Sequence, residues 1–147
     1  MNNRSFSESK NRPRWDWFSI QLSNHTEIMF YILKNKNNRV KPASSGTIVW
    51  ADQKTRHLLL KDVQIKVLDK WKSPKSHGTY PIQWQFKIPD LGIDIRITPA
   101  FKNQELNTQI TTRVTYWEGA VSVMGEMAGK KVTGQGYVEM TGYAKEQ

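Results

Sequence analysis

The sequence predicts an all-β fold, an antiparallel β-barrel of about eight strands formed by residues 14–147. Composition gives the first indication, because Ile, Val, Thr, Trp and Tyr are frequent while Leu and Ala are sparse. Spacing gives the second, because short apolar runs recur at close intervals with turn signals between them and no convincing helical period. Closing such a sheet into a barrel removes its exposed edges.

The chain has the length of one domain, with 147 residues and neither an internal repeat nor a linker. Residues 1–13 form a basic leader rich in Ser and Asn, which we expect to be disordered. The leader has no apolar segment of the kind found in signal peptides, and no run approaches the roughly 18–20 apolar residues of a transmembrane segment. Without cysteines, the compartment cannot be read from the sequence and stays unknown.

The formal net charge is +9, which would suit a protein that binds nucleic acid. Most of the positive charges, however, fall in the leader and in apparent loops, and no basic helix, RNA-binding aromatic motif or zinc-finger spacing accompanies them. We therefore expect solvated loops and no nucleic-acid partner. An anionic membrane surface and nucleic acid are the two alternatives for this charge.

The first two predicted strands are Arg14–Leu22 and Thr26–Lys34. In the first strand, Asp16 shares a face with the alternating apolar side chains, whereas Trp15 and Trp17 lie on the opposite face. The second strand is apolar on both faces. It is therefore expected to be at least partly covered on both sides.

The middle of the chain begins with a polar, basic loop over residues 35–45. A short strand over residues 46–51 and a longer one over residues 58–68 follow. A long turn then leads to the clearest alternation in the chain, a hairpin whose strands are residues 80–88 and 93–98. The side chains predicted to form its buried face are Tyr80, Ile82, Trp84, Phe86, Ile88, Ile93, Ile95 and Ile97. Residues 99–112 are predicted to be a loop.

The last two strands form a second hairpin, and each carries a carboxylate among aromatic residues. Tyr116 and Glu118 share one face, opposite Trp117, and Tyr137 and Glu139 share a face of the following strand. If these faces point inward, they line a polar, aromatic pocket. If they point outward, they belong to the surface, and the alternation alone does not decide between the two.

Several kinds of chemistry have no support in the sequence. The three histidines, His25, His57 and His77, fall in or beside separate turns, and no HExxH motif or other metal-ligand spacing is present. A phosphate-binding glycine loop and a nucleophile elbow are absent as well. Gly134 and Gly136 lie inside a predicted strand, where glycine usually marks a bulge, a bend or the close approach of another segment.

The carboxylates flanked by aromatic residues remain as chemical candidates. A carboxylic acid kept neutral by apolar surroundings can donate a proton. Aromatic faces stabilise a nearby cation. Together, these groups would suit protonation of an alkene followed by capture of the carbocation by water, or a related isomerisation without a cofactor.

Five motifs in a fixed order carry a family resemblance: WDWFSIQL, WKSPKSHGTYPIQW, IPDLGIDIRITPAFKNQEL, YWEGAVSVMG and GQGYVEMTGY. Over residues 14–144 the chain resembles the C-terminal half of the AttH-like, or CrtC-like, lipocalin-like proteins. That family includes carotenoid 1,2-hydratase, also called hydroxyneurosporene synthase, and many proteins described as predicted secreted hydrolases. The order of WDWF, YWEGAV and GYVEMTGY is specific, whereas each motif alone is weak.

The resemblance implies a calycin-type, lipocalin-like β-barrel that acts on or binds an apolar, lipid-like or isoprenoid molecule, with no metal and no organic cofactor. It implies a cell-envelope or periplasmic location for full-length relatives. By matching the polar positions of the family motifs, it identifies Asp16, Glu118 and Glu139 as candidate catalytic residues. The aromatic residues beside them become the candidate ligand-binding residues, namely Trp15, Trp17, Tyr116, Trp117 and Tyr137.

The chain departs from the family pattern at its N-terminus. Relatives usually have two such barrels in tandem, with the active site where they meet and a D-x-x-W-G-like motif just before WDWF. Here the basic leader occupies that place. We therefore expect a homodimer, or a complex with a separate N-terminal barrel, and little or no catalysis by the isolated chain. Three hypotheses follow: a ligand-binding domain, an active hydratase or hydrolase, and a structural barrel without a ligand.

Overall fold

The computed structural model describes residues 14–107 and 115–144, and these residues form a single curled antiparallel sheet. The predicted disorder of residues 1–13 lies outside the described residues. The strands are β1 (Arg14–Leu22), β2 (Glu27–Lys34), β3 (Ser45–Val49), β4 (Thr55–Leu59), β5 (Gln64–Lys72), β6 (Thr79–Ile88), β7 (Ile93–Pro99), β8 (Glu105–Asn107), β9 (Thr115–Met127) and β10 (Lys130–Thr141).

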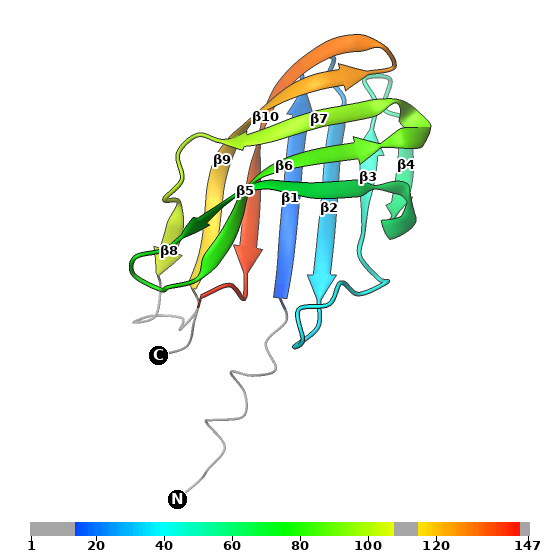
Figure 1. Cartoon of the computed structure of the whole chain (residues 1–147). Coiled ribbons are helices and arrows are strands. Elements are labelled where there is room, and N and C mark those ends of the chain that lie inside the picture. The colour runs from blue at the N-terminus through cyan, green and yellow to red at the C-terminus, as the bar shows by residue number, and fades with distance from the viewer. Residues whose placement is uncertain (1–13, 108–114, 145–147) are drawn as a thin grey trace, which may run out of the picture.

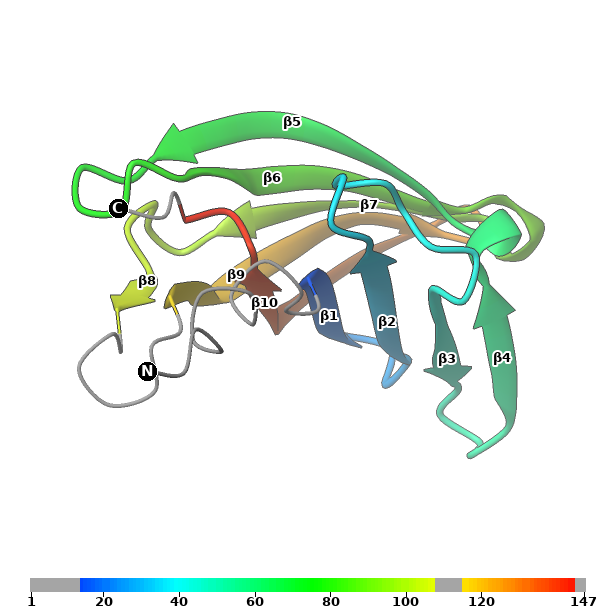
Figure 2. The same cartoon turned by 90° about the horizontal axis from the view of Figure 1, so that it is seen from below.

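The sheet has the order β4-β3-β2-β1-β10-β9-β7-β6-β5, with β8 added beside β9. It folds over on itself, so that β5, β6 and β7 cross in front of β1, β2 and β3 (Figure 1). Seen from below, the two groups of strands form two layers (Figure 2). Strand β9 joins them, because it pairs with β10 along its length and with β7 over its second half.

The observed fold confirms the predicted all-β, barrel-like class as a curled half-barrel, but with ten strands among the described residues rather than about eight. One extra strand arises because the predicted strand 58–68 is interrupted by a 3₁₀ turn, Leu60–Asp62. The Asp62 carboxylate accepts a hydrogen bond of 2.8 Å from the backbone N–H of Leu59, which stabilises this break. The other extra strand is β8, which lies within the predicted loop 99–112.

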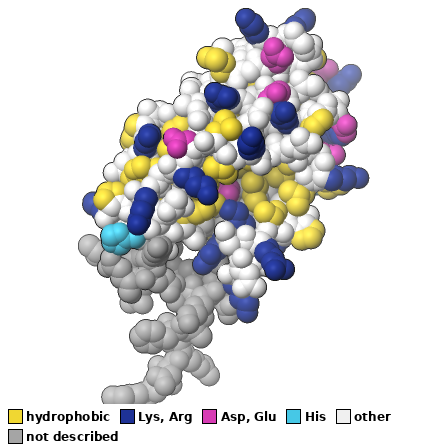
Figure 3. Space-filling model, viewed as in Figure 1, with side chains coloured by type: hydrophobic (Ala, Val, Ile, Leu, Met, Phe, Trp, Pro, Cys, Tyr) yellow, Lys and Arg dark blue, Asp and Glu magenta, His cyan; other side chains and the backbone are white. Residues whose placement is uncertain are grey.

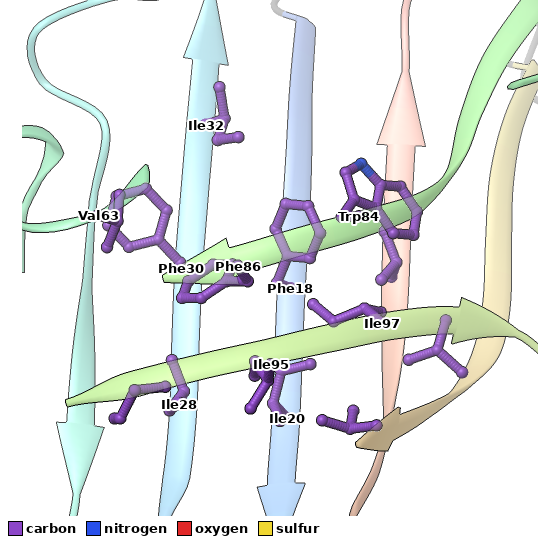
Figure 4. Close-up of a cluster of buried hydrophobic side chains, with 14 of the residues drawn as sticks. Phe18, Ile20, Ile28, Phe30, Ile32, Val63, Trp84, Phe86, Ile95 and Ile97 are labelled. Carbon is purple, nitrogen blue, oxygen red and sulfur yellow. The ribbon is translucent and has the colours of Figure 1, made fainter. Parts of the chain in front are cut away.

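The hydrophobic core fills the space between the two layers. The predicted buried face of the β6–β7 hairpin is confirmed, because all eight of its side chains are at most 2% exposed. Their main partners are the inward side chains of β1 and β2, and Phe18 lies edge-on to Trp84 with 5.2 Å between ring centroids. Phe30 meets Phe86 in the same manner at 6.2 Å. Figure 4 shows these rings and the neighbouring isoleucines interdigitating between the layers.

Strands β1 and β10 lie unusually close together at the glycines of the TGQGY segment. A Cβ atom on Gly136 would lie 2.1 Å from the carbonyl oxygen of Ser19, and one on Gly134 would lie 2.4 Å from that of Gln21. Both contacts are far shorter than any real Cβ contact, so no larger residue fits without moving β1. The glycines therefore mark close approach of another strand, one of the three predicted possibilities.

The face formed by β5, β6 and β7 is mixed in charge. Lys and Arg side chains are spread over it, with Asp and Glu between them (Figure 3). Two of its contacts are loose ion pairs, Lys87–Asp94 at 3.9 Å and Lys102–Asp69 at 4.0 Å. None of the helices in the described ranges is long and apolar enough to cross a membrane.

Candidate functional site

Asp16 lies in the interior, near one end of the half-barrel. Alternation along β1 directs its side chain to the same face as Phe18 and Ile20, as the sequence predicts, and the residue is 4% exposed. An aspartate buried to this degree needs partners for its charge and its lone pairs.

Lys34 and Tyr143 are those partners. The Lys34 Nζ atom lies 3.1 Å from Asp16 Oδ2, and the Tyr143 hydroxyl donates to both carboxylate oxygens at 2.9 Å. Lys34 also donates to the Tyr143 hydroxyl, and its Nζ atom lies 4.6 Å from the centroid of the Tyr143 ring. The β1–β2 register brings Lys34 opposite Arg14, while Tyr143 follows β10 after a turn at Gly142. Three distant segments thus meet at one carboxylate.

The electrostatics of this triad are dominated by burial. Burial raises the pKa of Asp16 above its ordinary value of 3.8, although Lys34 and the Tyr143 hydrogen bond act in the opposite direction. Burial, followed by the Asp16 charge, also raises the pKa of Tyr143 well above that of a free phenol. Tyr143 therefore keeps its proton at neutral pH and acts as a hydrogen-bond donor.

A second tyrosine extends this region toward β5. Tyr80 is fully buried, with its ring centroid 5.3 Å from that of Tyr143. The Tyr80 ring also stacks with Trp71, with 6.2 Å between ring centroids. The ring of Tyr143 therefore contacts both the ammonium group of Lys34 and the ring of Tyr80.

Glu105, on β8, completes the group. Each of its carboxylate oxygens accepts a hydrogen bond of 2.6 Å, one from the Ser73 hydroxyl and one from the Ser76 hydroxyl. We call the set formed by Asp16, Lys34, Ser73, Ser76, Tyr80, Glu105 and Tyr143 the inner polar cluster. It holds two carboxylates and two tyrosines in an otherwise apolar interior.

The other two predicted carboxylates lie elsewhere. Glu118 and Glu139 are directly opposite each other in the β9–β10 pair, and Trp17 is opposite Glu139 on β1. Trp17 is in turn opposite Tyr31 of β2, and their ring centroids are 6.0 Å apart. These four residues cross the outer face of the sheet, and we call them the outer acid row. Glu118 and Glu139 therefore point outward, away from Asp16.

The aromatic residues predicted to bind a ligand are divided between the two faces. Trp15 and Tyr116 are half-buried on the outer face, and Tyr137 is 51% exposed beside the outer acid row. Trp117 belongs to the core instead, where its Nε1–H donates to the carbonyl oxygen of Lys102 at 2.8 Å. The structure therefore assembles Trp15, Trp17, Tyr116 and Tyr137 on one surface and separates Trp117 from them.

The outer face of β2 differs from the prediction. Met29 and Tyr31 are 45% and 42% exposed, whereas coverage on both sides was expected. Only the inward residues of β2 meet the second layer, because β5, β6 and β7 lie across a single face of the sheet (Figure 2).

Six members of the inner polar cluster were not predicted as site residues: Lys34, Ser73, Ser76, Tyr80, Glu105 and Tyr143. Tyr80 was placed only in the core, and Glu105 only in a loop. One signal was available for Tyr143, which ends the GYVEMTGY motif that already pointed to Glu139. For Lys34 the only signal would have been the pairing register of β1 and β2.

Two surface depressions of the described residues lie away from the predicted site. The larger, of about 550 Å³, lies among the turns at the other end of β1 and is lined mainly by Trp50 and Met127 with polar neighbours. The smaller lies on β5 and β6. In the part of the chain that the structure describes, no group of three or more His, Asp or Glu side chains could hold a metal ion.

Comparison with known proteins identifies a family and two solved structures that this chain resembles. The family model described as AttH-like matches residues 3–143. An AttH protein from Nitrosomonas europaea has a similar structure, with a TM-score of 0.78 and 26% sequence identity over 90% of this chain. Kievitone hydratase from Nectria haematococca is also similar, with a TM-score of 0.70 and 26% identity over 87% of this chain. No curated protein matches the sequence.

Both solved structures are much longer than this chain. The match covers 39% of the AttH protein and 39% of kievitone hydratase. The chain thus spans about two fifths of the length of each.

Proposed function

Since the chain belongs to the AttH-like family, we propose that it is a lipocalin-like domain that binds an apolar, lipid-like or isoprenoid molecule at the inner polar cluster. The observation that carries this proposal is the buried Asp16 carboxyl, whose pKa is raised and whose partners are the Tyr143 hydroxyl and the Lys34 ammonium group. Similarity to a hydratase supports the same chemistry. An acid in such surroundings is suited to donate a proton to an apolar substrate.

The reaction that this arrangement favours is hydration of an alkene. The protonated Asp16 carboxyl gives its proton to one alkene carbon, forming a C–H bond and leaving a carbocation on the other carbon. The rings of Tyr143 and Tyr80 stabilise that cation. Water then forms the C–O bond and releases one proton, so that the net change is addition of one water molecule. The alternative function for the same site is that the chain by itself is an active hydratase or hydrolase.

We further propose that a second barrel completes the site, as half of a two-barrel protein. The support is the length of the matched proteins, together with the exposed aromatic residues of the outer face. Trp15 or Trp17 would lie at the contact, and Glu118 and Glu139 would act there, in a site shared with the second barrel. A homodimer through the same surface is the other form of this proposal.

Ligand binding is tested by titrating the full chain with an isoprenoid hydrocarbon and recording tryptophan fluorescence. Saturable binding is expected, weakened by Trp71→Ala and unchanged by Glu126→Gln, a variant of an exposed residue on β9. A chain that binds no lipid but binds DNA or RNA selectively at physiological salt would refute the proposal.

Catalysis is tested by incubating the chain with an isoprenoid alkene and measuring the alcohol formed, with Asp16→Asn as the control. Little or no turnover is expected, because one barrel supplies only one wall of the proposed site, and proton transfer needs a donor held close to the reacting carbon.

The proposed association is tested by analytical ultracentrifugation. Sedimentation should show a dimer that Trp17→Ser weakens. A strictly monomeric chain that turns over at an enzymatic rate would show that one barrel is sufficient.

A further inference from the structure

The Tyr80 hydroxyl is the one buried phenol of the inner polar cluster that lacks a hydrogen bond. Its oxygen is inaccessible, and the Glu105 and Ser76 side chains, which lie near enough to shift its pKa, do not meet it in full hydrogen-bond geometry. Buried hydroxyl groups without a partner are rare, because such a group loses its hydrogen bonds to water without replacement. An unpaired hydroxyl next to a proposed binding site is therefore a candidate ligand contact.

Glu105 is the charged group that faces this hydroxyl. Burial and then Glu105 raise the pKa of Tyr80 far above its ordinary value, so the phenol keeps its proton and can donate. Glu105 is itself fixed from the other side. The Ser73 hydroxyl accepts hydrogen bonds from the backbone N–H groups of Lys75 and Ser76, which leaves its own proton directed at Glu105.

The Ser76 hydroxyl is oriented in the same way. It accepts a hydrogen bond from the backbone N–H of Gly78 and donates to Glu105 at 2.6 Å. Each carboxylate oxygen of Glu105 thus accepts one serine proton and retains capacity for another donor. Among the described residues, the Glu105 carboxylate is held in one orientation by the two serines and can still accept a further hydrogen bond.

We propose that Tyr80 and Glu105 form a hydroxyl-binding subsite, in which Tyr80 donates to an oxygen whose own proton is accepted by Glu105. The oxygen belongs to the attacking water before hydration and to the alcohol group of the product afterwards. This inference rests on the proposed function of the domain, since it assigns the water to Tyr80 and Glu105 and the proton donation to Asp16.

The proton balance is simple. Asp16 loses one proton to the alkene carbon, and the water oxygen bonds to the cation while its extra proton passes to Glu105. Glu105 then releases that proton to solvent, and Asp16 takes one back. The overall reaction adds one water molecule to the double bond and consumes no other reactant.

The test compares two unreactive probes, a ten-carbon branched tertiary alcohol and the alkane of the same skeleton. The ratio of their dissociation constants is measured by tryptophan fluorescence for the full chain and for Tyr80→Phe and Glu105→Gln. Each variant is expected to lower the preference for the alcohol by about tenfold, as for loss of a hydrogen bond to a charged or buried group, and to leave alkane binding unchanged. Comparing ratios removes the difference in hydration between the probes.

Glu126→Gln is the matched control for Glu105→Gln, because it makes the same chemical change at an exposed position. A thermal melt of each variant checks folding, and Tyr80→Phe should melt no lower than the parent chain because it removes only an unpaired hydroxyl. If the probes bind and their ratio is the same in all variants, the subsite is wrong while apolar binding stands. If neither probe binds the parent chain, both the subsite and the proposed function fail.

Discussion

The inner polar cluster and the outer acid row contain the same kinds of residue in opposite surroundings. In both, a carboxylate lies among aromatic rings within a β-strand. Asp16 is almost fully buried and satisfied by Lys34 and Tyr143. Glu118 and Glu139 face outward and directly oppose each other, with no cation paired to either among the described residues.

The difference shows that the face of the strand, rather than the motif, decides what such a carboxylate can do. Burial raises the pKa of Asp16 above its ordinary value, and the proposed role of Asp16 as a proton donor depends on this property. An acid on the outer face acquires that property only if another protein surface covers it. The proposed second barrel would supply such a cover.

The largest expected effect on stability comes from disrupting the contacts among Asp16, Lys34 and Tyr143. Asp16→Ala removes the carboxylate and leaves Lys34, whose side chain is 13% exposed, with the Tyr143 hydroxyl as its remaining partner there. Loss of one partner of a buried ion pair costs roughly 3–5 kcal/mol of unfolding free energy. Urea denaturation of Asp16→Ala measures this cost. A loss below about 1 kcal/mol would mean that Lys34 reaches water easily and that the triad is looser than its distances indicate.

Tyr143→Phe should have a smaller effect, because it keeps the ring and the Asp16–Lys34 contact. It removes the hydroxyl that donates to both oxygens of Asp16, and a hydrogen bond to a charged group contributes about 1.5–3 kcal/mol. Denaturant melts of Tyr143→Phe beside Tyr137→Phe, which alters an exposed phenol, separate this contribution from a general effect of removing hydroxyl groups. Equal losses in the two variants would contradict it.

The third expected effect is a dependence of the unfolding free energy on pH. Because the pKa of Asp16 is raised on folding, the folded state holds its proton more tightly than the unfolded chain, whose value is 3.8. The stabilising contribution of this proton is complete below pH 3.8 and is lost as pH rises through the raised pKa. The unfolding free energy of the parent chain minus that of Asp16→Asn should therefore fall as pH increases above 3.8. If the difference increases instead, Lys34 outweighs burial.

The smallest effect belongs to the outer acid row and has the opposite sign. Glu118→Gln removes one of two like charges that face each other across β9 and β10, which should raise the unfolding free energy by about 0.2–1 kcal/mol. The gain should shrink in high salt, because exposed charges are screened. A destabilised Glu118→Gln would show that the outer face makes a contact through this carboxylate.

The fold could be predicted because its strands alternate clearly. In β6 and β7 every second residue is large and apolar, so both the hairpin and its buried face follow from the sequence. The inward orientation of Asp16 followed in the same way from Phe18 and Ile20. The strand count was harder, because the 3₁₀ turn before β5 depends on the Asp62–Leu59 hydrogen bond and β8 has only three residues.

The site was less predictable, because its partners meet only through strand pairing. Lys34 reaches Asp16 through the β1–β2 register, and Tyr143 arrives from the far end of the chain. The orientation of Glu118 and Glu139 was undecided because their strands carry large residues on both faces. Burial of Trp117 and Val138 under the second layer determines that Glu118 and Glu139 point outward.

The two outermost strands of the sheet, β4 and β5, pair on one side only in the described structure. A free strand edge is a template on which another chain can add a strand and begin fibrillar association. On β5 the pairing with β6 shifts register on both sides of Asp69, and the strand carries Lys66, Lys70 and Lys72. Irregular backbone and repeated positive charge make the β5 edge a poor template for another strand. The sheet curls without closing, and the sequence of β5 therefore protects this open edge against aggregation.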